Sequence, residues 1–222
     1  MPDRIYLDLS KLADGWLATA RATCEGKVKV ATHRGIDLAC ALALLLGTLP
    51  LLLLVALAIK LDSRGPVFYG QERVGLGGRR FTVYKFRSMR TDAEANGTAQ
   101  WASKADPRIT RVGRFLRLSR IDEIPQVFNV LRGDMALVGP RPERPAFVEQ
   151  LERVIPHYKD RTCVRPGITG WAQVNYPYGA SVEDARHKLT YDLYYIQHRG
   201  LRFDLRILLT TIGVVLLQEG AR

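Results

Sequence analysis

A run of 22 residues without a charge, from Leu38 to Ile59, constrains this chain more than any other feature. At ~1.5 Å per residue, a helix of that length reaches about 33 Å, close to the thickness of a bilayer's hydrocarbon core. A buried helix of a soluble domain seldom runs so far without a charge. The run also begins too late for a cleaved signal peptide, and no small-residue cleavage site precedes Lys60. The segment is therefore predicted to lie in a membrane.

Basic residues flank this run on both sides, with Arg34 before it and Lys60 and Arg64 after it. Because basic residues favour the cytoplasmic side, two basic flanks favour a helix with both ends on the same face. Pro50 lies in the middle of the run, where it removes a helical hydrogen bond and crowds the preceding turn. We therefore expect a re-entrant helix broken at Pro50, and an ordinary kinked spanning helix is the alternative.

The excess of basic residues is concentrated beside the apolar run. The chain has a net charge of +11, of which residues 60–90 contribute +6 and residues 104–120 contribute +5. Such stretches attract anionic phospholipid headgroups or a phosphate-rich substrate, whereas nucleic acid fits poorly beside a membrane anchor. The three cysteines form no metal-binding pattern and no disulfide framework, which indicates a reducing, cytoplasmic environment.

The rest of the chain predicts an α+β, mostly helical fold. Residues 66–87 contain two β-rich segments separated by a glycine-rich turn, which predicts a hairpin. A polar loop is expected over residues 90–107, a helix from Asp106-Pro107 to Arg120, and an interfacial helix from Leu201 to Gln218. The expected organisation is an amphipathic leader (1–32), the membrane helix (33–60) and a cytoplasmic domain (61–222).

Two neighbouring acids, Asp122 and Glu123, precede a predicted helix that Pro125 opens and Gly133 ends. The turn that enters a helix can bring both carboxylates to one point, and the helix dipole favours their ionised state. Metal ligands and anionic nucleophiles require that state. Acidic residues that merely cap a helix are the common alternative.

Two rigid, arginine-bearing loops follow. The prolines of the first loop fix the backbone around Arg141 and Arg144, which suits guanidinium groups that must meet phosphate oxygens. The second loop places Arg165 before a tight turn and Trp171, which either stacks on a base or is buried. Together these features describe a diphosphate site beside two carboxylates.

These motifs resemble the bacterial sugar transferases, and specifically the monotopic phosphoglycosyl transferases that begin exopolysaccharide, O-antigen or glycoprotein glycan assembly. The resemblance covers residues 33–217. The motifs that carry it are Tyr84–Met89 (YKFRSM), Asp106–Thr110 (DPRIT), Asp122–Gln126 (DEIPQ), Gly139–Pro142 (GPRP) and Arg165–Asn175 (RPGITGWAQVN).

The resemblance implies transfer of a sugar-1-phosphate from a UDP-sugar to undecaprenyl phosphate, with release of UMP, at the cytoplasmic face of the bacterial inner membrane. Asp122 is then the nucleophile of a ping-pong reaction, and Glu123 is its partner at a Mg²⁺ ion. The basic residues expected to bind the substrate phosphates are Lys85, Arg87, Arg117, Arg141, Arg144 and Arg165.

The resemblance leaves several points open. Arg120 and the segment 176–179 depart from the family's pattern, so the sugar is not identified. The sequence also leaves open the pathway, the acceptor chain length and the oligomeric state. Two other functions are alternatives: a membrane-tethered lipid-binding module, and a transferase that forms a glycosidic bond directly from a nucleotide sugar.

Overall fold

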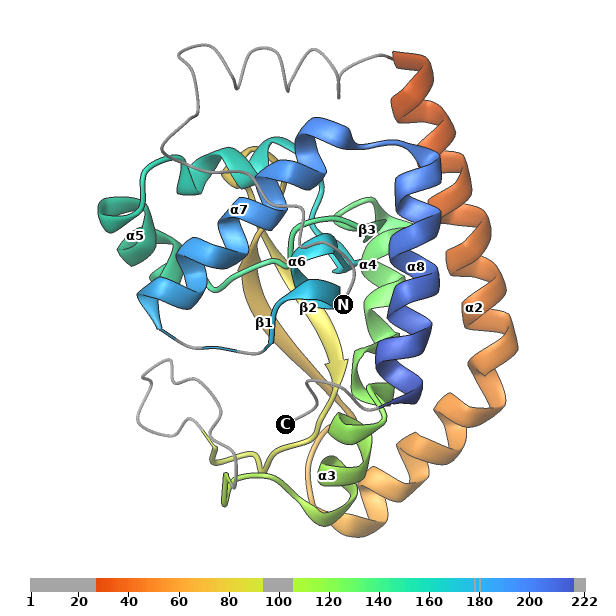
Figure 1. Ribbon diagram of the computed structural model, residues 1–222. Coiled ribbons are helices and arrows are strands. Elements are labelled where there is room, and N and C mark those ends of the chain that lie inside the picture. The colour runs from red at the N-terminus through yellow and green to blue at the C-terminus, as the bar shows by residue number, and fades with distance from the viewer. Residues whose placement is uncertain (1–26, 94–105, 178, 180, 218–222) are drawn as a thin grey trace.

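The computed structural model describes residues 27–93, 106–177, 179 and 181–217. Most of the predicted leader (residues 1–32) and of the predicted loop (residues 90–107) lies outside these residues. Helices dominate the described chain, together with one antiparallel hairpin and one short parallel strand pair (Figure 1). The expected α+β, mostly helical class with a small sheet and one long apolar helix is confirmed.

The long apolar helix is α2 (Lys27–Asp62), and Pro50 lies inside it. The helix continues through the proline, and Figure 1 shows its second half bending away from the direction of the first. In the turn before the proline, Thr48 Oγ1 donates a 2.7 Å hydrogen bond to the carbonyl of Leu44. Within the described part of the chain, α2 from Val30 onwards is the one segment long and apolar enough to cross a membrane.

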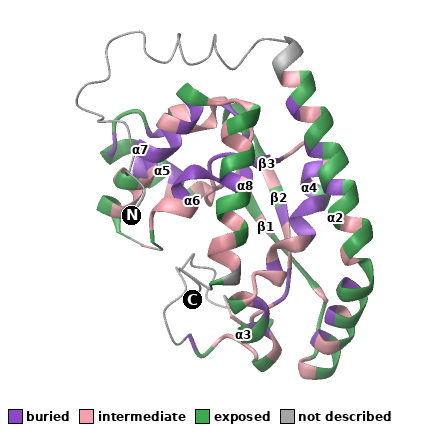
Figure 2. Ribbon diagram, turned by 45° about the vertical axis from the view of Figure 1, so that its right-hand side comes forward, coloured by how far each residue is buried: buried purple, intermediate pink, exposed green. Residues whose placement is uncertain are grey.

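One face of α2 packs on the rest of the molecule, and the other face is exposed (Figure 2). The buried apolar residues of the inner face are Ala41, Leu52, Val55 and Ile59. The outer face carries exposed leucines along most of its length: Leu38, Leu42, Leu44, Leu46, Leu49, Leu51, Leu53, Leu54, Leu57 and Leu61. In water such a stripe would be unfavourable, so this face is suited to lipid.

Both ends of α2 are bonded to the same folded body. Near its start, Arg34 Nη1 donates to the carbonyl of Val130 at 2.6 Å. At its end, Asp62 Oδ2 accepts a hydrogen bond from the backbone N–H of Val112 at 3.2 Å. The two ends of the apolar segment are therefore not separated into two independent domains.

The predicted hairpin is confirmed. Strands β1 (Phe68–Val74) and β2 (Arg80–Phe86) pair antiparallel, and the short 3₁₀ turn η2 (Leu76–Gly78) joins them. Gly77 and Gly78 have φ angles of 63° and 81°, which residues with a Cβ adopt reluctantly. The turn therefore requires glycine at these two positions, because both have a positive φ angle.

Helix α3 (Arg111–Leu118) begins later than expected. The prediction that it opens at Asp106-Pro107 is wrong, because the carboxylate of Asp106 binds the Arg108 side chain at 2.6 and 2.8 Å. Thr110 is the N-cap instead, and its Oγ1 accepts a hydrogen bond from the N–H of Gly113 at 2.9 Å. The helix is consequently one short amphipathic segment.

The two neighbouring acids lie in a 3₁₀ turn, η3 (Ile121–Gln126), that runs directly into α4 (Val127–Arg132). Pro125 lies inside η3, so the prediction that it is the first residue of the α-helix is wrong. Gly133 ends α4 with a φ of 96°, as expected of a C-terminal glycine. Strand β3 (Ala136–Val138) follows.

The remaining elements complete the body beside α2 (Figure 1). They are α5 (Pro145–Val154), η4 (Tyr158–Cys163), β4 (Gly167–Thr169), α6 (Trp171–Asn175), α7 (Val182–His198) and α8 (Leu201–Leu216). Strand β4 pairs parallel with β3. Trp171 is 4% exposed and packs edge-on against Phe203. Of the two alternatives for this residue, stacking on a base or burial in the fold, the structure shows burial.

Helix α8 confirms the expected C-terminal helix. It buries Ile207 and leaves Leu205, Leu209 and Ile212 exposed. Near its start, Asp204 accepts a hydrogen bond from Tyr195 at 2.9 Å. The helix thus has a packed face and an apolar exposed face.

Candidate active site

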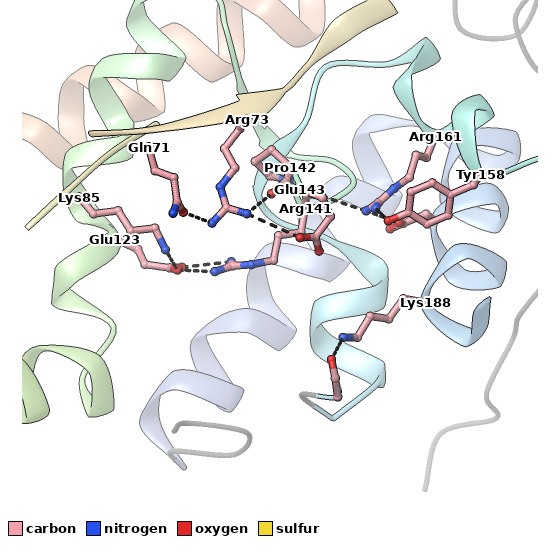
Figure 3. A network of polar contacts seen from close by, with 12 residues as sticks. Gln71, Arg73, Lys85, Glu123, Arg141, Pro142, Glu143, Tyr158, Arg161 and Lys188 are labelled. Carbon is pink, nitrogen blue, oxygen red and sulfur yellow. Dashed lines mark hydrogen bonds and ion pairs between the residues drawn. The ribbon is translucent and has the colours of Figure 1, made fainter. Parts of the chain in front are cut away.

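The centre of the candidate site is Glu123, whose carboxylate binds two cations from separate elements (Figure 3). Lys85, near the end of β2, donates to Glu123 Oε1 at 2.6 Å. Arg141, in the loop after β3, donates to the same oxygen at 2.6 Å and to Oε2 at 3.4 Å. We call Lys85, Glu123 and Arg141 the cationic cluster.

Charge balance in the cationic cluster keeps Glu123 ionised. Burial opposes ionisation, but Arg141 and Lys85 outweigh it and hold the pKa of Glu123 well below its usual range. Burial lowers the pKa of Lys85, and the negative charge of Glu123 offsets part of that effect. The site therefore contains a fixed anion with two partners that can also bind phosphate oxygens.

Asp122 differs from its neighbour. It is 8% exposed, and its Oδ1 is buried and accepts no hydrogen bond from the described residues. Burial, followed by the charge of Glu123, raises the pKa of Asp122 to about 6, although Lys85, Arg117 and Arg141 act in the opposite direction. Burial thus works against the ionised state that we expect from the sequence, although a carboxyl with this pKa is still mostly ionised at pH 7.

The two carboxylates are suited to a divalent cation. Mg²⁺ usually takes one or two protein carboxylates and completes its shell with water and substrate phosphates. The unpartnered, buried Oδ1 of Asp122 is an oxygen of the required kind, and Glu123 lies next to it. Among the described residues, no group of three or more His, Cys, Asp or Glu side chains gathers as a metal site. A cation here would therefore rely on this pair.

The loop that carries Arg141 is fastened from one side by Arg73 of β1 (Figure 3). Arg73 Nη1 donates to the carbonyl of Pro142 at 3.1 Å and lies 3.6 Å from a carboxylate oxygen of Glu143. Its other terminal nitrogen donates to Gln71. The proline-rich sequence predicted a rigid loop, and these contacts hold that loop against β1.

A second, largely buried group holds the same loop from the other side. Arg161 of η4 donates to the carbonyl of Arg141 at 2.9 Å and to the hydroxyl of Tyr158 at 2.8 Å. It also forms a 2.7 Å ion pair with Asp192 of α7, which is 2% exposed. Sequence reasoning missed these residues, although an acid inside the otherwise apolar stretch of α7 is a signal that a buried partner exists.

The structure places Arg87 outside the cationic cluster, against the sequence prediction. Its side chain is 4% exposed and donates to the carbonyls of Ser63 and Arg64 at 2.8 and 2.7 Å. These carbonyls follow the C-terminal end of α2, where a cation is favourable. The guanidinium of Arg87 thus stabilises the end of α2.

Two more predicted arginines also lie apart from Glu123. Arg165 Nε donates to the carbonyl of Gly133 at 3.0 Å. The guanidinium of Arg144 lies 5.9 Å from the centre of the Phe147 ring. Of the six basic residues proposed from sequence, the structure therefore brings Lys85 and Arg141 to Glu123, with Arg117 close enough to affect Asp122.

Comparison with known proteins adds independent findings. The model of a family described as bacterial sugar transferase matches residues 28–218. A UDP-N-acetylgalactosamine-undecaprenyl-phosphate N-acetylgalactosaminephosphotransferase of Aeromonas hydrophila is 50% identical over 189 residues, which are 85% of this chain and 44% of that protein. A UDP-glucose:undecaprenyl-phosphate glucose-1-phosphate transferase of Xanthomonas campestris pv. campestris is 48% identical over 183 residues, 82% of this chain and 38% of that protein.

A shorter relative is matched along most of its length. The exopolysaccharide production protein PSS of Rhizobium leguminosarum bv. phaseoli is 44% identical over 185 residues, which are 81% of this chain and 92% of that protein. By contrast, this chain spans less than half the length of the Aeromonas and Xanthomonas relatives.

Proposed function

Because this chain belongs to the bacterial sugar transferase family, whose model covers residues 28–218, we propose that it transfers a sugar-1-phosphate from a UDP-sugar to undecaprenyl phosphate and releases UMP. The names of the Aeromonas and Xanthomonas relatives describe transfer of a sugar phosphate to undecaprenyl phosphate. The observation that carries the proposal is the buried carboxylate of Asp122 beside the cationic cluster.

The reaction proceeds in two displacements at one phosphorus atom. An oxygen of Asp122 attacks the β-phosphorus of the UDP-sugar, and the bond from that phosphorus to the bridging oxygen breaks as UMP leaves. A phosphate oxygen of undecaprenyl phosphate then attacks the same phosphorus, and the bond to Asp122 breaks. The aspartate is regenerated, and the product is an undecaprenyl diphosphate sugar.

The basic side chains make the first displacement feasible. A carboxylate approaches a diphosphate against strong charge repulsion, so cations must neutralise the phosphate oxygens first. Lys85 and Arg141 are held in place by Glu123, and the charge of Arg117 offsets part of the rise in the pKa of Asp122. A Mg²⁺ ion held by Asp122 and Glu123 would supply further positive charge at the diphosphate when bound.

The apolar surface suggests how a lipid-linked acceptor reaches the site. Helix α3 ends just before η3 and carries the exposed side chains Phe115 and Leu118. The exposed leucines of α2 extend the same kind of surface. With these faces in lipid, Asp122 lies near the boundary where the phosphate head of a polyprenyl phosphate resides.

The proposal includes a monotopic placement, with α2 re-entrant at the cytoplasmic face of the bacterial inner membrane. The bonds of Arg34 and Asp62 to one folded body support it, since they tie both ends of α2 to a common domain. Residues 61–222 then form the cytoplasmic catalytic domain with α8 at the interface. In this placement the protein contacts membrane phospholipids, and it catalyses the first membrane step of glycoconjugate assembly.

The direct test is product analysis with the purified full chain in lipid nanodiscs. A panel of UDP-sugars is offered with undecaprenyl phosphate and Mg²⁺, and released nucleotide is identified. We expect UMP with at least one donor. Release of UDP would instead support direct glycosyl transfer, and failure with every donor despite retained lipid binding would support the membrane-tethered module.

A further inference from the structure

Asn129 of α4 is a fully buried polar residue that the proposed reaction does not use. It is 0% exposed, and both polar atoms of its side chain bond to the backbone of β2. Its Oδ1 accepts from the N–H of Tyr84 at 3.1 Å, and its Nδ2 donates to the carbonyl of Thr82 at 2.7 Å. The amide thus gives two backbone groups of β2 the partners that buried backbone groups need.

The position of these bonds on β2 is informative. In the hairpin, Thr82 pairs with Glu72 and Tyr84 pairs with Gly70. The N–H and C=O groups that bond Asn129 lie on the other edge of β2, where the two-stranded sheet has no further strand. The side chain of Asn129 therefore fills the edge of the sheet directly before Lys85.

The same residue also shapes the other end of α4. The backbone carbonyl of Asn129 accepts hydrogen bonds from the N–H groups of Gly133, Asp134 and Met135 at 3.1, 3.0 and 3.2 Å. This tight turn leads into β3 and then into the loop that carries Arg141. Asn129 thus contacts both chain segments that deliver a cation to Glu123.

We propose that Asn129 is a positioning residue, which fixes β2 against α4 so that Lys85 reaches Glu123. Glu123 lies in η3, which runs straight into α4, and Lys85 lies in β2. The hydrogen bonds of the Asn129 side chain therefore connect the segment that carries Glu123 to the strand that carries Lys85. The expected effect of Asn129 on turnover rests on the proposed function, whereas its expected effect on the position of β2 and Lys85 does not.

The side-chain chemistry explains why an asparagine is needed. A leucine has the same branched shape but no hydrogen-bonding atom, so it would leave the Tyr84 N–H and the Thr82 carbonyl without their partner. A serine is too short to serve both groups, and a glutamine is one methylene too long for a closely packed site. Substitution should therefore release β2 locally and leave most of the core intact.

The first experiment measures the structural part on the full chain in nanodiscs, without substrates. It compares Asn129→Ser and Asn129→Leu with Thr211→Val, a control that removes two part-buried hydrogen bonds, to Thr169 and to the carbonyl of Ile207. We expect hydrogen exchange at the Tyr84 N–H and acylation of Lys85, read by mass spectrometry, to become at least about tenfold faster in the Asn129 variants only. Unchanged acylation of Lys85 in a folded Asn129 variant would overturn the proposal.

The second experiment measures kinetics with the donor identified by the UMP assay. We expect kcat to fall about 10- to 100-fold in Asn129→Ser, with the donor KM within about threefold of the wild type. A loss no larger than that of Thr211→Val would contradict the proposal.

The two readouts separate the possible failures. If the wild-type chain releases no UMP, the proposed function fails, and the Lys85 acylation result still decides the role of Asn129. If both Asn129 variants fail to fold, the wild-type chain decides: slow exchange of the Tyr84 N–H supports the proposal, and exchange as fast as at an exposed residue overturns it.

Discussion

Asp122 and Glu123 are neighbours in sequence with opposite electrostatic environments. Glu123 has two cations within 2.6 Å, which keep it ionised despite burial. Asp122 has a buried oxygen without a partner among the described residues, and its pKa is raised to about 6. An anion in such a place is destabilising for the fold and reactive towards an electrophile. This pattern is typical of catalytic groups.

The first prediction concerns Asp122→Asn. We expect UMP release to fall by about a thousandfold or more, because the nucleophile is lost. In EDTA at pH 7 to 8 we expect the variant to be at least as stable as the wild type, by up to about 3 kcal/mol, which corresponds to the rise in pKa from 3.8 to about 6. Turnover and denaturant unfolding measure the two effects.

The sign follows from linkage. The folded wild type binds the Asp122 proton more tightly than the unfolded chain does, so this contribution to stability is complete below about pH 3.8 and is lost as the pH rises through about 6. The advantage of the variant should therefore disappear near pH 4. A variant with wild-type turnover would exclude Asp122 as the nucleophile.

A second prediction uses two arginines of one loop, Arg141 and Arg144. Only Arg141 binds Glu123, whereas Arg144 stacks near Phe147. We expect Arg141→Gln to lower kcat/KM about 100- to 1,000-fold, since a charged donor at the developing charge is removed. Arg144→Gln should cost much less. Equal losses in a steady-state UMP assay would restore the sequence-based assignment of Arg144.

At the scale of elements, the sequence predicted local features well. The hairpin, the C-terminal glycine of α4 and the helix of residues 201–216 follow from turn glycines and apolar periodicity. The start of α3 differs from the prediction because the Asp106 carboxylate binds the backbone N–H and the side chain of Arg108, and Thr110 caps the helix instead.

The sequence did not predict which residues distant along the chain form hydrogen bonds and ion pairs with one another. The proline-rich sequence around Arg141 predicted a rigid loop, but the partners of Arg87, Arg161 and Arg141 depend on the fold, which decides the carbonyls or carboxylates around each guanidinium. Asp122 and Glu123 were identified from their position before a helix. Their different pKa shifts depend on burial, which raises the pKa of Asp122, and on the charges of Arg141 and Lys85, which lower the pKa of Glu123. Burial and both cations come from the fold and not from the neighbouring sequence.

The third prediction concerns the buried pair of η4 and α7, Arg161 and Asp192. Arg161→Met leaves the Asp192 carboxylate buried without its cation, and we expect the free energy of unfolding to fall by about 3–5 kcal/mol. The double variant Arg161→Met/Asp192→Leu should recover a substantial part of that loss. Denaturant unfolding in detergent micelles gives the coupling energy, and strictly additive losses would show that the pair is not a unit.

At the scale of the whole molecule, α2 packs along one side of the domain and is not a separate membrane anchor (Figure 1). Its inner face packs on the body from near its start to near its end, as buried His33, Ala41 and Ile59 show, while its outer face is a stripe of leucines. A charge-free run predicts burial in lipid. It does not predict that a folded domain accompanies the run along its length.

The fourth prediction concerns the topology of α2. In a chain whose three native cysteines are replaced by alanine, Ala31→Cys and Pro66→Cys place a thiol at an exposed position before and after the apolar run. We expect both thiols to react with a membrane-impermeant maleimide in inverted vesicles and neither to react in intact spheroplasts. Reaction from opposite faces would show that α2 spans the bilayer.

The covalent step tests the whole account most directly. The full chain in nanodiscs is mixed with Mg²⁺ and its UDP-sugar carrying ³²P at the β-phosphate, without acceptor, and is quenched rapidly. The account predicts labelled protein in the wild type, loss of the label on addition of undecaprenyl phosphate, and no label in Asp122→Asn. Acceptor-dependent UMP release by a wild-type chain that never carries label would contradict it.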